Sequence, residues 1–171
     1  MIWVTPLSAL QQTLDSTGAR RVLTLLSQGT SLSLPPALRS TEWLHLGMHD
    51  IAGEVPGYTA PSASHVESML EFGLNWKRAQ EGPLIVHCYA GISRSTAAAY
   101  VIAAALRPDR DEEELALELR RLAPTATPNP LIVAHADRLL GRNGRMSEAI
   151  RRIGRGAEAS EGTPFCLRIG G

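Results

Sequence analysis

One stretch near the middle of the chain, from Leu84 to Leu106, constrains the fold more than any other. Its first three residues, Leu84-Ile85-Val86, form an unbroken apolar run, which is typical of a strand buried on both faces of a sheet. From Arg94 onward an alanine-rich run predicts a helix that ends before Arg107-Pro108. A buried strand joined to a helix by a short loop is the building unit of α/β proteins.

Further predicted strands and helices alternate around this unit. With 171 residues, of which 44% are hydrophobic, the chain is long enough for one stable core. We therefore expect a single α/β domain over residues 1–171, with a central, mostly parallel sheet flanked by helices. The other predicted strands are Ile2–Thr5, Arg21–Leu26, Glu42–Met48 and a final strand or tail at Pro164–Ile169. The other predicted helices are Ser8–Gly18, a segment from Ser62 or Ser64 to Lys77, Asp111–Leu122, Asn129–Leu140 and Arg145–Ile153.

The loop between the buried strand and its helix has the features of an anion site. Successive backbone N–H groups of a tight loop form a concavity for an anion, and the N-terminus of the following helix adds unpaired N–H groups. The planar guanidinium of Arg94 can bind two phosphate oxygens at once, and Gly91 permits an unusual backbone conformation. The residues expected to bind a phosphate are Tyr89, Ala90, Gly91, Ile92, Ser93 and Arg94, with the Tyr89 ring either lining the pocket or packing outward.

The same loop favours a reactive cysteine. A thiol beside a helix N-terminus and an arginine has its pKa lowered, so we expect Cys88 to be a thiolate near neutral pH, ready to attack phosphorus. Ser95 follows the arginine, and its hydroxyl can hydrogen-bond the sulfur when the sulfur becomes a leaving group. We interpret His87 as a structural residue that holds the loop and not as a base.

These residues resemble a known signature. His87-Cys88, five residues, and Arg94-Ser95 are similar to the motif of cysteine-dependent protein tyrosine phosphatases. The glycine and serine within the loop resemble the dual-specificity subgroup, and the whole chain resembles a set of compact bacterial predicted tyrosine phosphatases. The resemblance implies an α/β phosphatase fold and hydrolysis of phosphate monoesters through a phosphocysteine intermediate, without cofactor or metal.

A second part of the resemblance lies after the predicted helix Asp111–Leu122. Pro128-Asn129 opens a helix, as a Pro-Asn pair does in dual-specificity enzymes, which makes Asn129 a supporting residue of the site. Those enzymes usually have a glutamine later in that helix, where this chain has His135. The resemblance extends from about Glu42 to Leu140.

The resemblance also implies a general acid, an aspartate some thirty to forty residues before the cysteine. Asp50 precedes Cys88 by 38 positions and is the only aspartate between Asp15 and Asp109. It opens residues 49–64, a segment rich in Gly and Pro that we expect to form the rim of an active site. Glu54 on the same segment is an alternative acid, and a local capping role for Asp50 is the other interpretation.

The charge and the cysteine content limit the classes of binding partner and the cellular compartment that we expect. Lys plus Arg equals Asp plus Glu at 17 each, so bulk attraction to nucleic acid or to an acidic membrane is not expected. Two cysteines far apart in the sequence fit a reducing compartment, and the N-terminus lacks the pattern of a signal peptide. A cytoplasmic protein is therefore expected, and the sequence does not indicate an oligomeric state. We expect no disulfide between Cys88 and Cys166.

The expected activity is hydrolysis of protein phosphotyrosine, extending to phosphoserine or phosphothreonine, so the expected partner is a phosphorylated protein or peptide. A phosphoinositide, a nucleotide or an RNA 5′ end is the alternative substrate, although residues 89–93 contain no lysine to favour a highly anionic ligand. An inactive phosphate-binding module is the third interpretation. The acidic residues Asp111-Glu112-Glu113-Glu114 are expected to be a solvated helix start. The arginines of a basic C-terminal helix are expected to form an exposed surface, with binding of an acidic partner as the alternative: Arg145, Arg151, Arg152 and Arg155.

Overall fold

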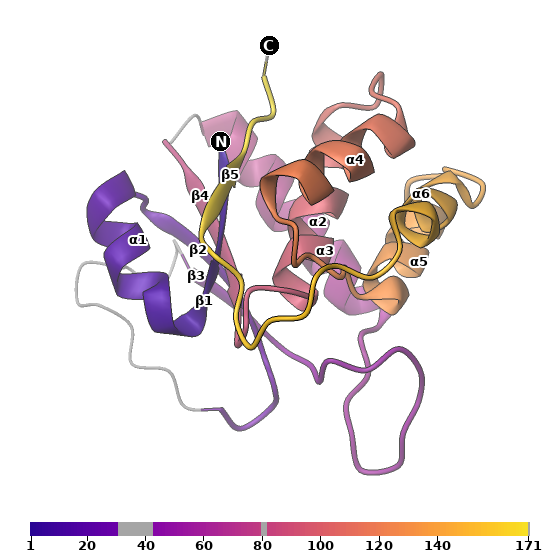
Figure 1. Ribbon diagram of the computed structural model, residues 1–171, viewed down its shortest axis with the longest axis horizontal. Helices are drawn as coiled ribbons and strands as arrows, with labels where there is room; N and C mark the ends of the chain where they lie inside the picture. Colours follow the sequence, from indigo (N-terminus) through magenta and orange to yellow (C-terminus); the bar gives the residue numbers. More distant parts are fainter. Residues whose placement is uncertain (31–42, 80–81, 171) are drawn as a thin grey trace.

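Five strands form one sheet in the order β3-β2-β4-β1-β5 in the computed structural model, which describes residues 1–30, 43–79 and 82–170 (Figure 1). The strands β1 to β4 run parallel, and β5 lies antiparallel against β1 at the edge. This confirms the predicted α/β class and the mostly parallel sheet. The bounds are β1 Ile2–Pro6, β2 Arg21–Leu26, β3 Trp43–Gly47, β4 Leu84–Cys88 and β5 Phe165–Leu167. Glu42, predicted as the start of the third strand, lies outside the described residues.

Helices cover both faces of the sheet unequally. Figure 1 shows α1 alone on one side and α2 to α6 gathered on the other. Their bounds, with the short 3-10 helix η1, are η1 Leu7–Ala9, α1 Leu10–Thr17, α2 Ala63–Ala79, α3 Arg94–Leu106, α4 Glu112–Leu122, α5 Pro130–Leu139 and α6 Arg145–Ile153. Ser62 is the cap of α2, since its hydroxyl accepts a hydrogen bond from His65 N.

The central strand β4 brings the cysteine loop to the middle of one sheet edge. All five residues of β4 are buried, and the strand pairs with β1 on one side and β2 on the other. Cys88 lies opposite Pro6 and Leu25 in these ladders. The carboxyl ends of β1, β2 and β4 therefore meet at one edge, where α/β sheets bind ligands.

Helix α3 lies at the centre of the main core. Every residue from Arg94 to Ala104 is buried, which explains the alanine content: small side chains let a helix be enclosed by neighbours on all sides. It packs against β1, β4, α2, α4 and α5. Burying the start of α3 fixes the position of the loop that precedes it.

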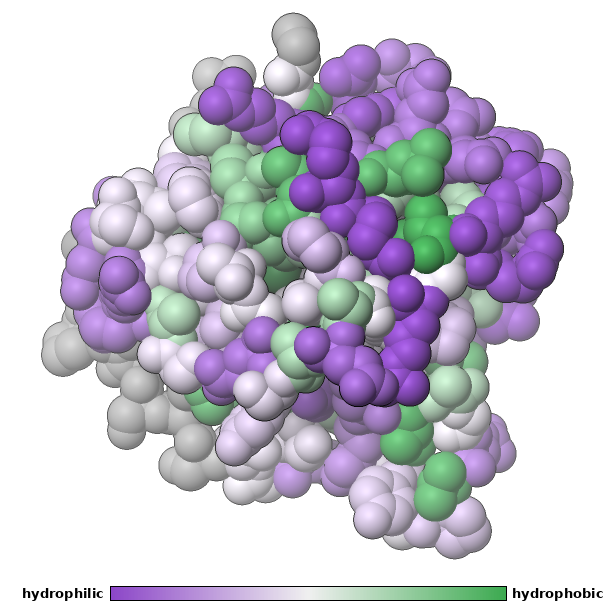
Figure 2. Space-filling view, viewed as in Figure 1, coloured by the Kyte–Doolittle hydropathy of each residue, from purple (hydrophilic) through white to green (hydrophobic). Residues whose placement is uncertain are grey.

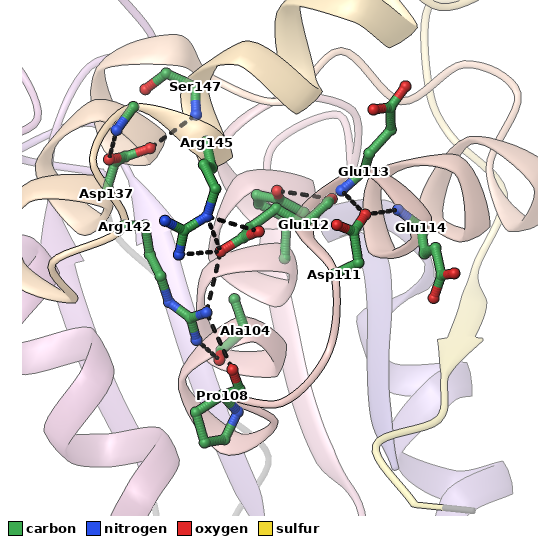
Figure 3. Close-up of polar contacts among 12 residues, drawn as sticks. Ala104, Pro108, Asp111, Glu112, Glu113, Glu114, Asp137, Arg142, Arg145 and Ser147 are labelled. Atoms are coloured by element: carbon green, nitrogen blue, oxygen red, sulfur yellow. Dashed lines mark hydrogen bonds and ion pairs between the residues drawn. The ribbon is translucent and has the colours of Figure 1, made fainter.

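Part of the acidic segment is buried, which contradicts the expectation of a fully solvated helix start. Asp111 caps α4, but Glu112 is only 5% exposed. Its carboxylate accepts hydrogen bonds from Arg142 at 3.0 Å and from Arg145 at 3.2 Å (Figure 3). Arg142 also donates to Ala104 O and Pro108 O, and so ties the end of α3 to the start of α4 and to the turn after α5.

The arginines of α6 are largely engaged within the chain. Arg151 and Arg152 bond Glu148, and Arg152 also reaches Glu113 of α4. Figure 2 shows that much of the surface over α4 and α6 is hydrophilic. In the part of the chain that is described, no helix combines the length and the apolar character needed to span a bilayer.

Candidate active site

Cys88 ends β4 at the floor of a loop formed by residues 88–94. Its thiol is 2% exposed, with Sγ 3.3 Å from Gly91 N and 3.1 Å from Ser95 Oγ. Ser95 lies in the first turn of α3, so the sulfur is held between a loop amide and the hydroxyl of the helix. Both groups can donate to a thiolate, and hydrogen bonds to the charged form stabilise it.

Four carbonyl groups of the loop point away from its concave side. Each accepts a hydrogen bond from the backbone of another segment: Tyr89 O from Leu7 N at 3.0 Å, Ala90 O from Gly162 N at 2.8 Å, Ile92 O from Thr127 N at 3.0 Å and Ser93 O from Asn129 N at 3.3 Å. In a trans peptide the N–H points opposite to the C=O. The amides that follow these carbonyls are therefore directed to the inner side, which makes the loop a cradle for an anion.

Two features of the position of Gly91 exclude a residue with a side chain. Its φ is +70°, in the left-handed region that favours glycine. A Cβ there would also lie 2.7 Å from Pro6 N at the end of β1. The special conformation predicted for this glycine is therefore present, and the close approach of β1 is an additional reason for it.

The Arg94 guanidinium is buried and only partly satisfied. Its Nη1 donates to Met48 O at 2.8 Å, whereas Nε is buried and has no hydrogen bond among the described residues. The side chain is 7% exposed. A buried cation with an unpartnered N–H is costly unless an anion arrives, so this edge of Arg94 is suited to binding one.

Asp50 lies at the mouth of the same loop. Its Oδ1 accepts from Ser93 Oγ at 2.7 Å, and its Oδ2 is 3.9 Å from Arg94 Nε. The side chain is 37% exposed, so the carboxylate faces both the loop and solvent. Glu54 lies at an exposed position further along the segment and has no polar contact with the described residues of the loop. Of the two carboxylates considered from the sequence, Asp50 is the one that contacts the loop.

The segment that carries Asp50 is closed at its base by two hydrogen bonds between His49 and Thr59. His49 N donates to Thr59 O at 2.8 Å, and Thr59 N donates to His49 Nδ1 at 2.9 Å. The His49 ring also contacts Tyr58 edge-on. These contacts hold both ends of the excursion together and fix the direction in which Asp50 leaves β3.

Asn129 joins Asp50 to α5. Its Nδ2 donates to Asp50 Oδ1 at 2.9 Å and to Ile51 O at 3.1 Å. Its Oδ1 accepts from Leu131 N and Ile132 N as the helix cap. His135 lies six residues after Asn129 on the same helix, and its Nε2 is hydrogen-bonded to Pro61 O at 3.2 Å. Helix α5 therefore contacts the rim segment at two points.

His87 is buried behind the loop. Its Nε2 lies 2.7 Å from Thr24 Oγ1, which also accepts from Trp43 Nε1 at 3.0 Å. Burial, which outweighs the other influences, lowers the pKa of His87 to about 4. The imidazole is therefore neutral near pH 7, and its contact with Thr24 links β4 to β2.

The remaining predicted residues fall on the loop wall. Tyr89 is 64% exposed, while Ala90, Ile92 and Ser93 are partly buried.

The second cysteine, Cys166, lies on the edge strand β5. It is opposite Trp3 of β1, which in turn is opposite Ile85 of β4, three residues before Cys88. Both thiols are free, and this register keeps them apart. Within residues 1–30, 43–79 and 82–170, no group of three or more His, Cys, Asp and Glu side chains is placed to hold a metal ion.

Several residues that build the site were not predicted. Leu7, Thr127 and Gly162 act through backbone N–H groups, and Met48 acts through its carbonyl. Every non-proline residue carries these groups, so no sequence pattern marks them. Thr24 contributes a hydroxyl, but its position opposite His87 depends on the register of β2 and β4.

Solved structures with similar folds are phosphatases and related proteins. DUSP15 matches with a TM-score of 0.61 at 17% identity, covering 89% of this chain and 88% of that one. PTPMT1 in complex with PI(5)P matches with a TM-score of 0.60 at 16% identity, covering 88% and 90%. The human tyrosine phosphatase-like serine/threonine/tyrosine-interacting protein matches with a TM-score of 0.62 at 14% identity, covering 83% and 92%.

No family model and no curated protein sequence matches the chain. At 14–17% identity the structural matches show the fold alone. The chain therefore has the fold of the dual-specificity and protein tyrosine phosphatases.

Proposed function

We propose that this chain is a phosphatase that hydrolyses phosphate monoesters through a cysteinyl phosphate, with protein phosphotyrosine as its substrate. The observation that carries the proposal is the position of Cys88 Sγ beneath an amide-lined loop, within 3.3 Å of Gly91 N and 3.1 Å of Ser95 Oγ. The Arg94 guanidinium, whose Nε has no hydrogen bond among the described residues, supplies the positive charge for an oxyanion at the same loop.

The first step transfers the phosphoryl group to sulfur. The Cys88 thiolate forms a bond to phosphorus while the bond from phosphorus to the leaving oxygen breaks. Asp50 gives its proton to that oxygen, for which its position at the mouth of the loop is suitable. The loop amides and Arg94 stabilise the charge on the equatorial oxygens.

The second step returns the enzyme to its starting state. Asp50, now ionised, takes a proton from a water molecule that attacks phosphorus, and the bond between sulfur and phosphorus breaks. Ser95 donates its hydroxyl hydrogen bond to the departing sulfur, for which the 3.1 Å contact is suitable. Inorganic phosphate then leaves the loop.

The loop composition supports a singly phosphorylated substrate. Residues 89–93 contribute no lysine, and Arg94 is the cation of the site. A ligand with several phosphates would gain little beyond its first phosphate in such a loop. A phosphoinositide is the second candidate, because PTPMT1, one of the structures of similar fold, was solved with PI(5)P.

The test is hydrolysis of p-nitrophenyl phosphate in EDTA at pH 5 to 8 by the wild type, Cys88→Ser and Cys166→Ser. We expect turnover that is lost with Cys88 and retained without Cys166. Measurable turnover by Cys88→Ser would exclude the cysteinyl phosphate. Binding of vanadate without any turnover in the wild type would favour an inactive phosphate-binding module.

Substrate class is decided by matched assays at equal phosphate concentration. The proposal predicts the highest kcat/KM for a phosphotyrosine peptide, compared with the same peptide carrying phosphoserine and with vesicles containing PI(5)P. Preference for the vesicles would overturn the assignment of a protein substrate while leaving the chemistry intact.

A further inference from the structure

The segment between α6 and β5, residues 154–164, crosses the carboxyl edge of the sheet beneath the cysteine loop (Figure 1). We call this segment the C-terminal strap. It has no helix or strand of its own, yet it is anchored along its length. Arg120 of α4 donates to Ile153 O, Gly154 O and Arg155 O; Gly156 N donates to Thr127 Oγ1; Ala157 N donates to Pro124 O; and Glu161 accepts from Ser8 Oγ.

The strap is hydrogen-bonded to the loop through Gly162. Gly162 N donates to Ala90 O at 2.8 Å. The N–H of the same peptide plane belongs to Gly91, and it points at Cys88 Sγ at 3.3 Å. One rigid amide therefore receives a hydrogen bond from the strap on its outer side and donates a hydrogen bond to the sulfur on its inner side.

The packing at this contact is close enough to require glycine on both sides. A Cβ on Gly162 would lie 2.9 Å from Gly91 O and 3.5 Å from the Ile92 side chain. A Cβ on Gly91 would meet the backbone of β1. The peptide group between Ala90 and Gly91 is thus held between the end of β1 and the strap, with little room to rotate.

We propose that the C-terminal strap positions the Ala90–Gly91 peptide group and thereby stabilises the Cys88 thiolate, with Gly162 as the positioning residue. The proposal rests on the proposed role of Cys88 as nucleophile. Two physical effects act together. The hydrogen bond from Gly162 fixes the plane so that the Gly91 N–H aims at sulfur, and a chain of hydrogen bonds polarises each member. A bond to a charged acceptor also depends more on alignment than one to a neutral thiol.

The test measures the thiol directly and needs no turnover. In a Cys166→Ser background, Cys88 is the only thiol, and its rate of alkylation by iodoacetamide between pH 4 and pH 9 reports the thiolate. Gly162→Ala forces the strap away from Gly91 O, and Gly162→Pro deletes the donor. Gly170→Ala, where an added Cβ meets nothing within 4 Å, is the matched control in the same C-terminal region.

We expect both Gly162 variants to slow alkylation at pH 5.5 roughly three- to tenfold, because a smaller fraction of Cys88 is then thiolate. The control should match the background protein. Folding is checked by thermal melting, and only folded protein is compared. A folded Gly162 variant that is alkylated at the rate of the control across this pH range would overturn the proposal.

A second measurement uses the wild type, so it does not depend on the folding of any variant. If the strap stabilises the anion-binding state of the loop, then anion binding must stabilise the strap, because coupling between two sites is reciprocal. Saturating vanadate should slow hydrogen exchange of the Gly162 amide at least threefold. Unchanged exchange under conditions where vanadate binds would overturn the proposal. Failure of vanadate to bind would instead count against the proposed function, and the alkylation experiment would still decide the role of the strap.

Discussion

Asn129 connects the start of α5 to the carboxylate of Asp50. Its Nδ2 lies 2.9 Å from Asp50 Oδ1, while its own Oδ1 caps the helix. The orientation of the proposed acid is therefore fixed by a helix that begins 79 residues later in the chain. Ser93 holds the same oxygen from the cysteine loop at 2.7 Å. Oδ2, which lies 3.9 Å from Arg94 Nε and has no hydrogen bond among the described residues, is then the oxygen that we expect to exchange a proton with a leaving group.

Asn129→Ser separates these two roles. Serine retains a cap for α5 but does not reach Asp50, whereas Asn129→Ala loses both. We expect Asn129→Ser to lower kcat about tenfold on phenyl phosphate, comparable to losing one hydrogen bond to a charged group worth about 1.5 kcal/mol. The alanine variant should show a similar loss of kcat and, in addition, a lower melting temperature. Equal kcat in wild type and Asn129→Ser would show that the contact does not position Asp50.

Asp50→Asn removes the proposed acid without changing its shape. The loss should depend on the leaving group, because an acid matters most when the departing oxygen is strongly basic. We expect kcat to fall about 10²- to 10⁴-fold on phenyl phosphate and much less on p-nitrophenyl phosphate. The control is Glu54→Gln on the same segment, which should behave as wild type with both substrates. A loss confined to Glu54→Gln would transfer the role to that residue.

Arg94→Lys tests whether the planar guanidinium group, with its several N–H donors, is required. A lysine keeps the positive charge but presents it as a point, and it cannot bond Met48 O and two phosphate oxygens in one plane. We expect kcat/KM to fall about 10²- to 10³-fold and vanadate affinity to weaken with it. Wild-type affinity in the folded lysine variant would show that charge alone is sufficient.

Much of the site was predictable because its chemistry is local in sequence. Cys88, Gly91, Arg94 and Ser95 lie within eight positions, so a buried strand and a helix suffice to bring them together. Asp50 was proposed because the resemblance implies an aspartate thirty to forty residues before the cysteine and Asp50 is the aspartate at that distance. Its contact with Ser93 is consistent with that position, and its role as an acid stays a prediction.

The parts that were missed depend on distant partners. Glu112 was assigned to a solvated helix start because the pattern of residues 111–114 fits one, and nothing nearby indicates the arginine that lies 30 positions later. The strap was missed for another reason, since Gly162 contributes only an N–H, which carries no signature in a sequence. The irregular form of residues 154–164 gives no periodicity to read.

His87 predicts a pH dependence of stability. Burial lowers the pKa of His87 to about 4, whereas an unfolded histidine has a pKa near 6.5. In this pH range the histidine is protonated in the unfolded chain but not in the folded chain. The free energy of unfolding therefore falls as the pH drops from about 6.5 to about 4. The loss from this residue amounts to about 3 kcal/mol over that window.

Urea unfolding of wild type and His87→Gln at pH 7.5 and pH 4.5 measures this effect. Glutamine keeps a polar group near Thr24 but does not titrate. We expect the wild type to lose about 2 to 3 kcal/mol more than the variant between the two pH values. Parallel losses would show that the histidine titrates in the folded state as it does in the unfolded state.

Arg142 should contribute more to stability than the exposed arginines of α6. It is nearly buried and bonds Glu112, Ala104 O and Pro108 O, so Arg142→Met leaves three acceptors short of a partner (Figure 3). We expect a loss of about 3 kcal/mol in urea unfolding at pH 7, because two backbone carbonyls lose their donor and the buried Glu112 carboxylate keeps only the more exposed Arg145 as its cation. Arg152→Met, an exposed arginine on α6, is the control and should leave the midpoint nearly unchanged. Replacing Glu112 as well, in Glu112→Leu/Arg142→Met, should recover part of the loss, since the buried carboxylate that lost one of its two arginine partners is gone. A double variant as unstable as the sum of its single variants would instead mean that Arg142 acts only through the backbone carbonyls that it bonds.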